Sequence, residues 1–224
     1  MTRQWPGRRL TRLLLPIWLL PVSAAAQEEW SGVRVDLAET DIEWNFDGGK
    51  REASISRVSF EMEGAAPTGL IAGFGLGYMS VSLRSGAGMQ ARRFDAEYFE
   101  VFLRQPFDLG DHFRLHAGFD YRYNSGRDRD EDHPADIDWT EVAFEVGAGW
   151  RLTDTFRVTP FARYYSIDGD LDEDIGGVES FDLDDPVSGG IRFDYFVEET
   201  AFVRFEYQTG EYAGGYLIFA REYF

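Results

Sequence analysis

Apolar and polar residues alternate along most of the chain after Gln27, in segments of about ten residues. The clearest segment is 113–124, in which the odd-numbered residues are apolar or aromatic and the even-numbered ones are mostly charged or polar. The same period of two recurs, more or less cleanly, in the segments 57–63, 70–78, 99–109, 139–152, 156–165, 187–197 and 201–209. A period of two is typical of strands with one apolar face, so we expect nearly all of this part to be strand and turn.

The first segment, 33–46, changes parity in its middle. Val33, Val35 and Leu37 share one face, whereas the apolar residues at 42, 44 and 46 have the opposite parity. A β-bulge near residues 38–40 would bring both sets to the same face, because a bulge adds one residue to a strand. We therefore expect a bulge there.

The connections between the predicted strands alternate in length. The short links lie near residues 65–69, 110–112, 153–154 and 198–200. Those between them lie near 47–53, 84–95, 125–138, 168–186 and 210–214, and all but the last are long. Short turns at one end and long loops at the other predict an all-β fold, an antiparallel up-and-down transmembrane β-barrel of about ten strands, with eight as the alternative. Such a barrel is expected in the bacterial outer membrane.

Aromatic residues gather at both ends of the predicted strands. Those at the long-loop ends are Tyr78, Tyr121, Tyr123, Trp139, Tyr164 and Tyr207. Those at the short-turn ends are Phe107, Trp150, Phe156 and Phe224. Two aromatic girdles are typical of a barrel that crosses the outer membrane, so this pattern supports the same architecture.

The polar face of the predicted strands carries nearly balanced charge. Its basic residues are Arg34, Arg57, Arg104, Arg114, Arg122, Arg151, Arg157, Arg163, Arg192, Arg204 and Arg221. Its acidic residues are Asp36, Glu61, Glu63, Glu100, Asp120, Glu141, Glu145, Asp194 and Glu206. In a narrow barrel this face lines the interior, where an unpaired charge is costly, so we expect the charges to pair across strands.

Residues 1–26 have the pattern of a secretory signal peptide. A basic stretch with four arginines precedes the apolar run 13–22, and three alanines follow at 24–26. The apolar run is about half as long as a membrane-spanning helix and contains two prolines. We therefore predict cleavage after Ala26 and one remaining domain, an outer-membrane β-barrel over residues 27–224.

Composition narrows the classes of function. The chain has 224 residues, 40 acidic and 22 basic side chains and a net charge of −18, and Lys50 is its only lysine. Nucleic acid is not expected as a partner, because phosphate binding requires a basic face. The absence of cysteine excludes disulfides, thiolate metal sites and cysteine nucleophiles. We expect the acidic excess to lie in the loops.

The sequence resembles the small bacterial outer-membrane β-barrel proteins of the OmpX, Opa and OmpA type, within the porin-type superfamily. The resemblance rests on the signal peptide, the absent cysteine, the amphipathic strands and the final strand GYLIFAREYF, which ends in Phe224. It implies that the barrel-assembly machinery recognises this last strand through Phe224 and the apolar residues at every second position before it. The residues that fit this pattern are Tyr216, Ile218 and Ala220.

One acidic segment has the spacing of a calcium loop. Residues 168–179 read DGDLDEDIGGVE, with carboxylates at the first, third, fifth, seventh and twelfth positions of an EF-hand loop. These candidate ligands are Asp168, Asp170, Asp172, Asp174 and Glu179. Against calcium, Glu173 replaces the glycine of the sharp turn and the segment joins strands. No other cofactor is expected, and a solvated acidic loop is the competing interpretation.

Catalysis has little support in the sequence. His116 shares a strand face with Asp120, but residues four apart along a strand lie about 13 Å from each other, so it is read as a structural lumen histidine. His133 lies in an acidic loop without a serine and histidine pair at a family-specific spacing. The glycines at 73, 75 and 77 alternate within a strand and are read as small lumen-facing residues. Enzymatic activity is therefore not favoured.

These observations lead to one main functional hypothesis and two alternatives. The main one is a barrel with a narrow, charge-filled lumen and acidic extracellular loops, in a structural or surface-interaction role. The first alternative is a narrow channel with porin-like transport, and the second is a lipid-A-modifying or proteolytic barrel enzyme. Outer-membrane lipid and lipopolysaccharide are the expected surroundings, and a monomer is expected.

Overall fold

The computed structural model describes residues 32–86, 90–128, 134–173, 177–198 and 201–222. These residues form one antiparallel sheet of eleven strands. In this part of the chain no helix is long and apolar enough to cross a membrane. The predicted signal peptide, residues 1–26, lies outside the described residues, and so do His133, Asp174 and Phe224.

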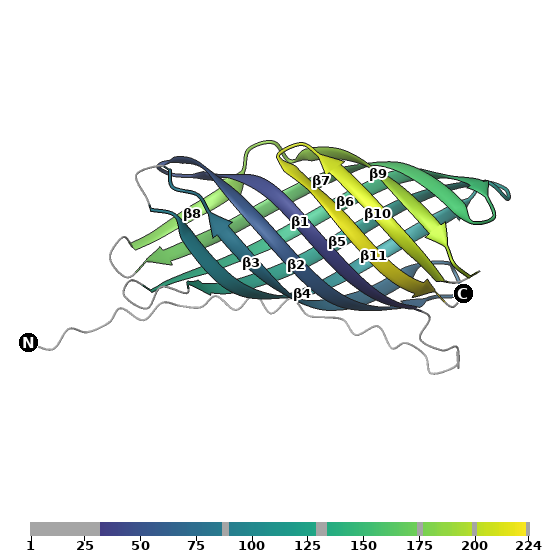
Figure 1. Ribbon diagram of the computed structural model, residues 1–224, viewed down its shortest axis with the longest axis horizontal. Helices are drawn as coiled ribbons and strands as arrows, with labels where there is room; N and C mark the ends of the chain where they lie inside the picture. Colours follow the sequence, from purple (N-terminus) through teal and green to yellow (C-terminus); the bar gives the residue numbers. More distant parts are fainter. Residues whose placement is uncertain (1–31, 87–89, 129–133, 174–176, 199–200, 223–224) are drawn as a thin grey trace, which may run out of the picture.

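Ten of the strands form a closed ring (Figure 1). The ring runs from β1 through β7, continues with β9, β10 and β11, and closes where β11 pairs with β1, from Gly32 opposite Glu222 to Ile42 opposite Tyr212. The strands are β1 (Gly32–Phe46), β2 (Gly49–Ala65), β3 (Ile71–Leu83), β4 (Arg92–Asp108), β5 (Phe113–Asp128), β6 (Ala135–Thr153), β7 (Phe156–Glu173), β8 (Gly177–Leu183), β9 (Val187–Phe196), β10 (Ala201–Thr209) and β11 (Tyr212–Glu222). The predicted ten-stranded antiparallel barrel is confirmed.

Strand lengths divide the barrel into two sections. β9, β10 and β11 have 10, 9 and 11 residues, which is about the length that a tilted strand needs to cross a membrane. β1 to β7 have 13 to 19 residues and continue beyond them. In Figure 1 the three short strands end near the middle of the molecule, and β8 lies at the left end.

β8 closes the barrel a second time at this far end. It pairs with residues 168–173 of β7 and with Trp44–Phe46 of β1. At that level the ring therefore consists of eight strands, β1 to β8, instead of ten. The loop expected over 168–186 is thus mostly strand.

The outer face changes from apolar to polar at one level. On β1 the exposed Leu37 is followed by Glu39 and Asp41, and on β2 Val58 is preceded by Ser56. On β3, β5, β7 and β10 the last large apolar position is a tyrosine, followed two residues later by serine or threonine; these tyrosines are Tyr78, Tyr123, Tyr164 and Tyr207. We call the section beyond this level the extension. It is formed by β8 and residues 39–56, 79–86, 90–98, 124–128, 134–141 and 165–173. We call the opposite end of the barrel the turn end.

The inner face changes from charged to apolar at the same level. On β1 the inward residues Arg34 and Asp36 give way to Ile42, Trp44 and Phe46, and the strand stays in register with both neighbours. The predicted bulge near residues 38–40 is therefore wrong. The parity change marks the point at which the apolar residues of β1 move from the outer face of the barrel, where the surroundings are apolar, to the inner face, where they enclose an apolar core.

The aromatic girdle is confirmed for Tyr78, Tyr123, Tyr164 and Tyr207 at the start of the extension, and for Phe107 and Trp150 at the turn end, all of which are exposed. Trp139 was predicted to belong to the girdle and does not. Its side chain is 2% exposed and points into the extension, because it lies beyond the level at which apolar residues turn inward.

Truncation of the aromatic residue on β8 tests how the extension is closed. Phe181 is 3% exposed, and its ring stacks on Trp44 with the centroids 4.5 Å apart. Phe181→Ala should lower the free energy of unfolding by about 3–5 kcal/mol, because it leaves a cavity among aromatic rings. It should also expose residues 177–183 of β8 to protease in detergent-solubilised barrel. Val178→Ala, at a position 43% exposed on the same strand, is the matched control and should change neither measurement.

Candidate functional site

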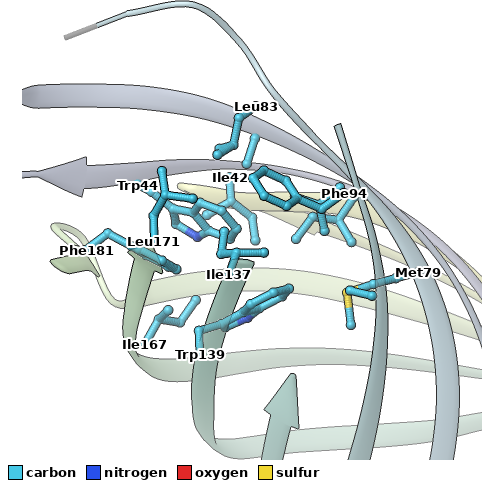
Figure 2. Close-up of a cluster of buried hydrophobic side chains, with 14 of the residues drawn as sticks. Ile42, Trp44, Met79, Leu83, Phe94, Ile137, Trp139, Ile167, Leu171 and Phe181 are labelled. Carbon is cyan, nitrogen blue, oxygen red and sulfur yellow. The ribbon is translucent and has the colours of Figure 1, made fainter. Parts of the chain in front are cut away.

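The interior of the extension is filled by an apolar core, which we call the plug (Figure 2). Its members are Ile42, Trp44, Phe46, Ala53, Ile55, Met79, Val81, Leu83, Phe94, Ala96, Tyr98, Ala135, Ile137, Trp139, Ala143, Tyr165, Ile167, Leu171, Phe181 and Tyr212. Figure 2 shows Trp44 and Trp139 in the same interior as Ile137, Leu171 and Phe181. The ring centroids of the two tryptophans lie 5.5 Å apart. Side chains from seven of the strands around the extension thus fill its interior.

An arginine covers the plug at the mouth of the extension. Arg51 is 2% exposed, lies 5.4 Å from the centroid of the Phe46 ring, and donates hydrogen bonds to the carbonyl oxygens of Arg84 and Gln90. These carbonyls belong to the connection between β3 and β4. Arg92 adds a second tie, with ion pairs of 2.6 Å to Asp128 and 2.8 Å to Glu173. The mouth is therefore held closed by side chains from β2, β4, β5 and β7.

The only lysine lies at the seam where eight strands replace ten. The Nζ atom of Lys50 lies 2.7 Å from Glu43, 3.0 Å from Asp184 and 3.8 Å from Glu211. Hydrogen bonds to Glu43 and then to Asp184 raise the pKa of the ammonium above its usual value. The backbone N–H of Asp185 also donates to Glu211 over 2.6 Å. This cluster joins the start of β2 to the connections that follow β8 and β10, and the sequence pattern gave no signal for it.

Below the plug lies a cavity of about 170 Å³ lined by charged side chains. Its arginines are Arg34, Arg57, Arg104, Arg114, Arg122, Arg157, Arg163, Arg192 and Arg204. Its carboxylates are Asp36, Glu61, Glu63, Glu100, Asp120, Glu141, Glu145, Asp194 and Glu206. Nine positive and nine negative groups therefore share the space, as the balanced polar face predicted.

Glu145 on β6 is the centre of this network. One of its oxygens, Oε1, lies 2.6 Å from Nη1 of Arg192 and 2.8 Å from Nε2 of His116. The other, Oε2, accepts a hydrogen bond of 2.9 Å from Nε of Arg163. Arg192 also donates to Glu206 over 2.5 Å, and Arg163 lies 3.4 Å from the same carboxylate. Strands β5, β6, β7, β9 and β10 are thus joined across the lumen by one cluster.

A second cluster lies directly beneath the plug. Arg122 bridges Glu100 and Glu141, with closest N–O distances of 2.6 and 2.7 Å. The hydroxyl of Tyr212 donates to Glu141 over 2.9 Å and accepts a hydrogen bond of 2.7 Å from Arg57. The ring of Tyr212 stacks on Tyr165 with centroids 4.3 Å apart. Tyr212 therefore belongs to the plug by its ring and to the charged network by its hydroxyl.

Glycines on β3 make room for the large inward side chains of β4. A Cβ atom at Gly73, Gly75 or Gly77 would lie within 3 Å of Phe102, Glu100 or Tyr98, respectively. The interpretation of these glycines as small lumen-facing residues is confirmed.

One of the predicted lumen arginines lies elsewhere. Arg221 is 51% exposed and lies 3.5 Å from Glu198 at the turn end, because β11 presents its even-numbered residues inward. Arg151 lies on the inner face as predicted, opposite Arg157 at the turn end, where both arginines pack over the ring of Phe196. His116 lies in the lumen as predicted, and its carboxylate partner is Glu145, on the neighbouring strand, instead of Asp120.

The candidate calcium ligands lie on both faces of the sheet. Asp168, Asp170 and Asp172 are exposed on the outer face of β7, and Asp170 accepts a hydrogen bond of 2.8 Å from Ser180. Glu179 lies opposite Leu171, whose side chain points inward. Among the described residues no group of three or more His, Asp or Glu side chains is placed to hold a metal ion. Because Asp174 lies outside them, the calcium loop stays a prediction.

The last strand has its lipid-facing residues at odd positions. Leu217 and Phe219 are exposed on the outer face, whereas Ile218 is buried and lines the cavity with Tyr216. The apolar set that resembles the assembly signal, Tyr216, Ile218 and Ala220, thus has inward parity. Recognition by the assembly machinery stays a prediction.

Removal of the central charge tests the lumen network. In Glu145→Gln, Arg163 and Arg192 lose their shared carboxylate in a confined space, so the free energy of unfolding should fall by about 3–5 kcal/mol. Guanidinium titration of the detergent-solubilised barrel measures this change. Glu52→Gln is the control, because its pair with Arg84 is more than half exposed on both side chains and should contribute less than about 1 kcal/mol. Equal effects of the two variants would contradict a charge-paired lumen.

Comparisons with known proteins agree with this geometry. The family model described as "Outer membrane protein beta-barrel domain" matches residues 13–217. No curated protein matches the chain. Among solved structures, the β domain of the Bordetella autotransporter BrkA is 11% identical, with 88% of this chain and 100% of that chain covered and a TM-score of 0.50.

Two further solved structures are similar. Neisserial surface protein A is 14% identical, with coverage of 75% and 100% and a TM-score of 0.42. An outer-membrane channel from Pseudomonas putida F1 is 10% identical, with coverage of 90% and 98% and a TM-score of 0.48. At such identities a structural likeness concerns the fold alone. The family match covers most of the chain, and the chain therefore belongs to the outer-membrane protein β-barrel domain family and is a protein of the bacterial outer membrane.

Proposed function

We propose that this protein is a closed barrel that serves as a structural anchor and presents an acidic eight-stranded extension outside the cell. The observation that carries the proposal is the plug, which fills the extension with apolar side chains. An ion that entered from this side would have to leave water and cross an apolar core, which is strongly unfavourable. The short turns face the periplasm in this orientation, as in other barrels of the outer membrane.

The lumen below the plug supports the same function. The inner end of the cavity is lined by Arg57, Glu141, Tyr165 and Tyr212, directly beneath the plug. Most of the charged side chains within it form ion pairs with one another, which leaves few of them free to bind a passing solute. A narrow channel and a barrel enzyme remain the alternatives, and the experiments below distinguish the channel.

The outer surface of the extension supports a role in surface interaction. Asp138 lies opposite Asp170, and Asp168 lies opposite Asp182, all of them exposed. Like charges directly opposite each other destabilise a pair of strands. These pairs reduce the stability of the extension, but they attract cationic groups outside the cell. Their presence supports a surface that contacts such groups.

Electrical recording tests whether the barrel is closed. Purified wild-type protein in planar bilayers should show no steady conductance. The triple variant Trp44→Ala, Trp139→Ala, Phe181→Ala should show transient openings, because it removes three rings that pack against one another in the plug. Glu145→Gln, which alters the lumen and leaves the plug intact, should stay silent. A stable open state of the wild type would overturn the proposal and favour the channel.

Single cysteines test which end lies outside the cell, because the natural chain has none. Asp170→Cys, on the outer face of the extension, should react with a membrane-impermeant maleimide on intact cells. Asp111→Cys, in the turn between β4 and β5, should react only after the outer membrane is permeabilised. Labelling in the reverse order would refute an extracellular extension.

A further inference from the structure

A groove of about 550 Å³ crosses the outer wall of the barrel where the extension begins. It runs over β10, β11, β1, β2 and β3, the part of the wall that contains the closure between β11 and β1. Its lower side is one row of apolar residues that are direct cross-strand partners: Phe205, Leu217, Leu37, Val58 and Tyr78. Its upper side is the next outward row, Gly215, Glu39, Ser56 and Ser80.

The groove exists because the upper row is made of small side chains. Gly215 presents no side chain, and a Cβ atom added there would meet nothing within 4 Å. Ser56 and Ser80 are small, whereas the residues of the lower row are large and 37–49% exposed. The wall therefore steps inward above the apolar row.

This step lies at the boundary between acyl chains and head groups. On β11, β1, β2 and β3 the lower row is the last apolar row, and the upper row begins the polar outer face of the extension. On β10 one further aromatic residue, Tyr207, lies at the level of the upper row, next to Gly215. Tyr78 and Tyr207, which flank the groove, belong to the aromatic girdle that marks a membrane interface. An amphiphile in the outer leaflet would have its chains below the step and its head group above it.

Glu39 gives the groove a charge preference. Its side chain is exposed, and within the part of the chain that the structure describes it forms no hydrogen bond or ion pair. It is the only charged side chain in the upper row, and Gly215 and Ser56 are its cross-strand neighbours. A carboxylate held at an interface of reduced dielectric constant favours a cationic partner. An anionic head group would be repelled there.

We propose that this groove binds a lipid of the outer leaflet whose head group carries an ammonium. One acyl chain lies along the row from Phe205 to Tyr78, and the ammonium pairs with Glu39. The hydroxyls of Ser56 and Ser80 donate hydrogen bonds to ester or phosphate oxygens of the same lipid. The site rests on the proposed extracellular position of the extension and does not depend on a closed lumen.

Lipid retention in native mass spectrometry tests the site, with phosphatidylethanolamine and phosphatidylglycerol of identical acyl chains as the probes. The wild type should retain phosphatidylethanolamine with a preference of about three- to five-fold, as expected for one partly exposed ion pair. Glu39→Gln should retain both lipids equally, because it removes the charge and keeps the groove. Gly215→Phe should lose retention of both, because the ring occupies the groove.

Ala162→Phe is the matched control, since Ala162 is exposed on the outer face of β7, away from the groove. It should behave as the wild type, and the heat-dependent gel migration of each variant verifies that the barrel has folded. Equal retention of the two lipids by the wild type would overturn the ammonium preference. Unchanged retention by folded Gly215→Phe would show that the lipids bind elsewhere and would overturn the groove itself.

Discussion

Closure of β1 on β11 is the constraint on which the rest of the structure depends. In lipid no solvent satisfies an unpaired backbone group, so every strand that crosses the membrane needs a partner on both sides. A ring of ten strands meets this requirement, but it also encloses a space that side chains must fill. Because the outer face has to be apolar and side chains alternate between the two faces, the polar residues point into that space. There nine arginines balance the charge of nine carboxylates. The charged lumen follows from closure.

In the extension the same alternation of strand faces applies, but water surrounds the outer face and apolar side chains fill the interior. Beyond the girdle the outer face meets water, so the polar residues of each strand turn outward and the apolar ones enclose a core. Ten strands would leave this core too wide to fill, since barrel diameter grows with strand number. Replacing β9, β10 and β11 with the single strand β8 reduces the ring to eight, a size at which side chains alone fill the interior. The aromatic stack of Phe181 on Trp44 holds that strand in place.

The sequence was sufficient for the barrel and its charged lumen, because both depend only on strand parity. The predictions from the sequence were wrong where the surroundings of one strand change along its length. Ile42, Trp44 and Phe46 have the correct parity for a core outside the membrane, and the bulge was inferred only because one apolar face was assumed throughout. Residues 168–173 were taken as loop because their exposed positions are aspartates, although Ile167 and Leu171 continue the alternation on the inner side. Cross-barrel partners such as Glu145 with Arg192 lie 47 residues apart, and no local pattern encodes which pairs meet.

The two changes of polarity, outside and inside, occur at one level because they have one cause. Each strand has only two faces, so a strand that exchanges lipid for water outside must exchange charge for apolar packing inside, unless its alternation is interrupted. Tyr212 lies at this level and serves both sides of the change, with its ring stacked in the plug and its hydroxyl bound to Arg57 and Glu141. Glu39 occupies the corresponding place on the outer face, where the first outward-facing carboxylate of β1 follows the last outward-facing apolar residue, Leu37. The plug, the lumen network and the groove are therefore three local consequences of one boundary, the surface of the membrane at which the extension begins.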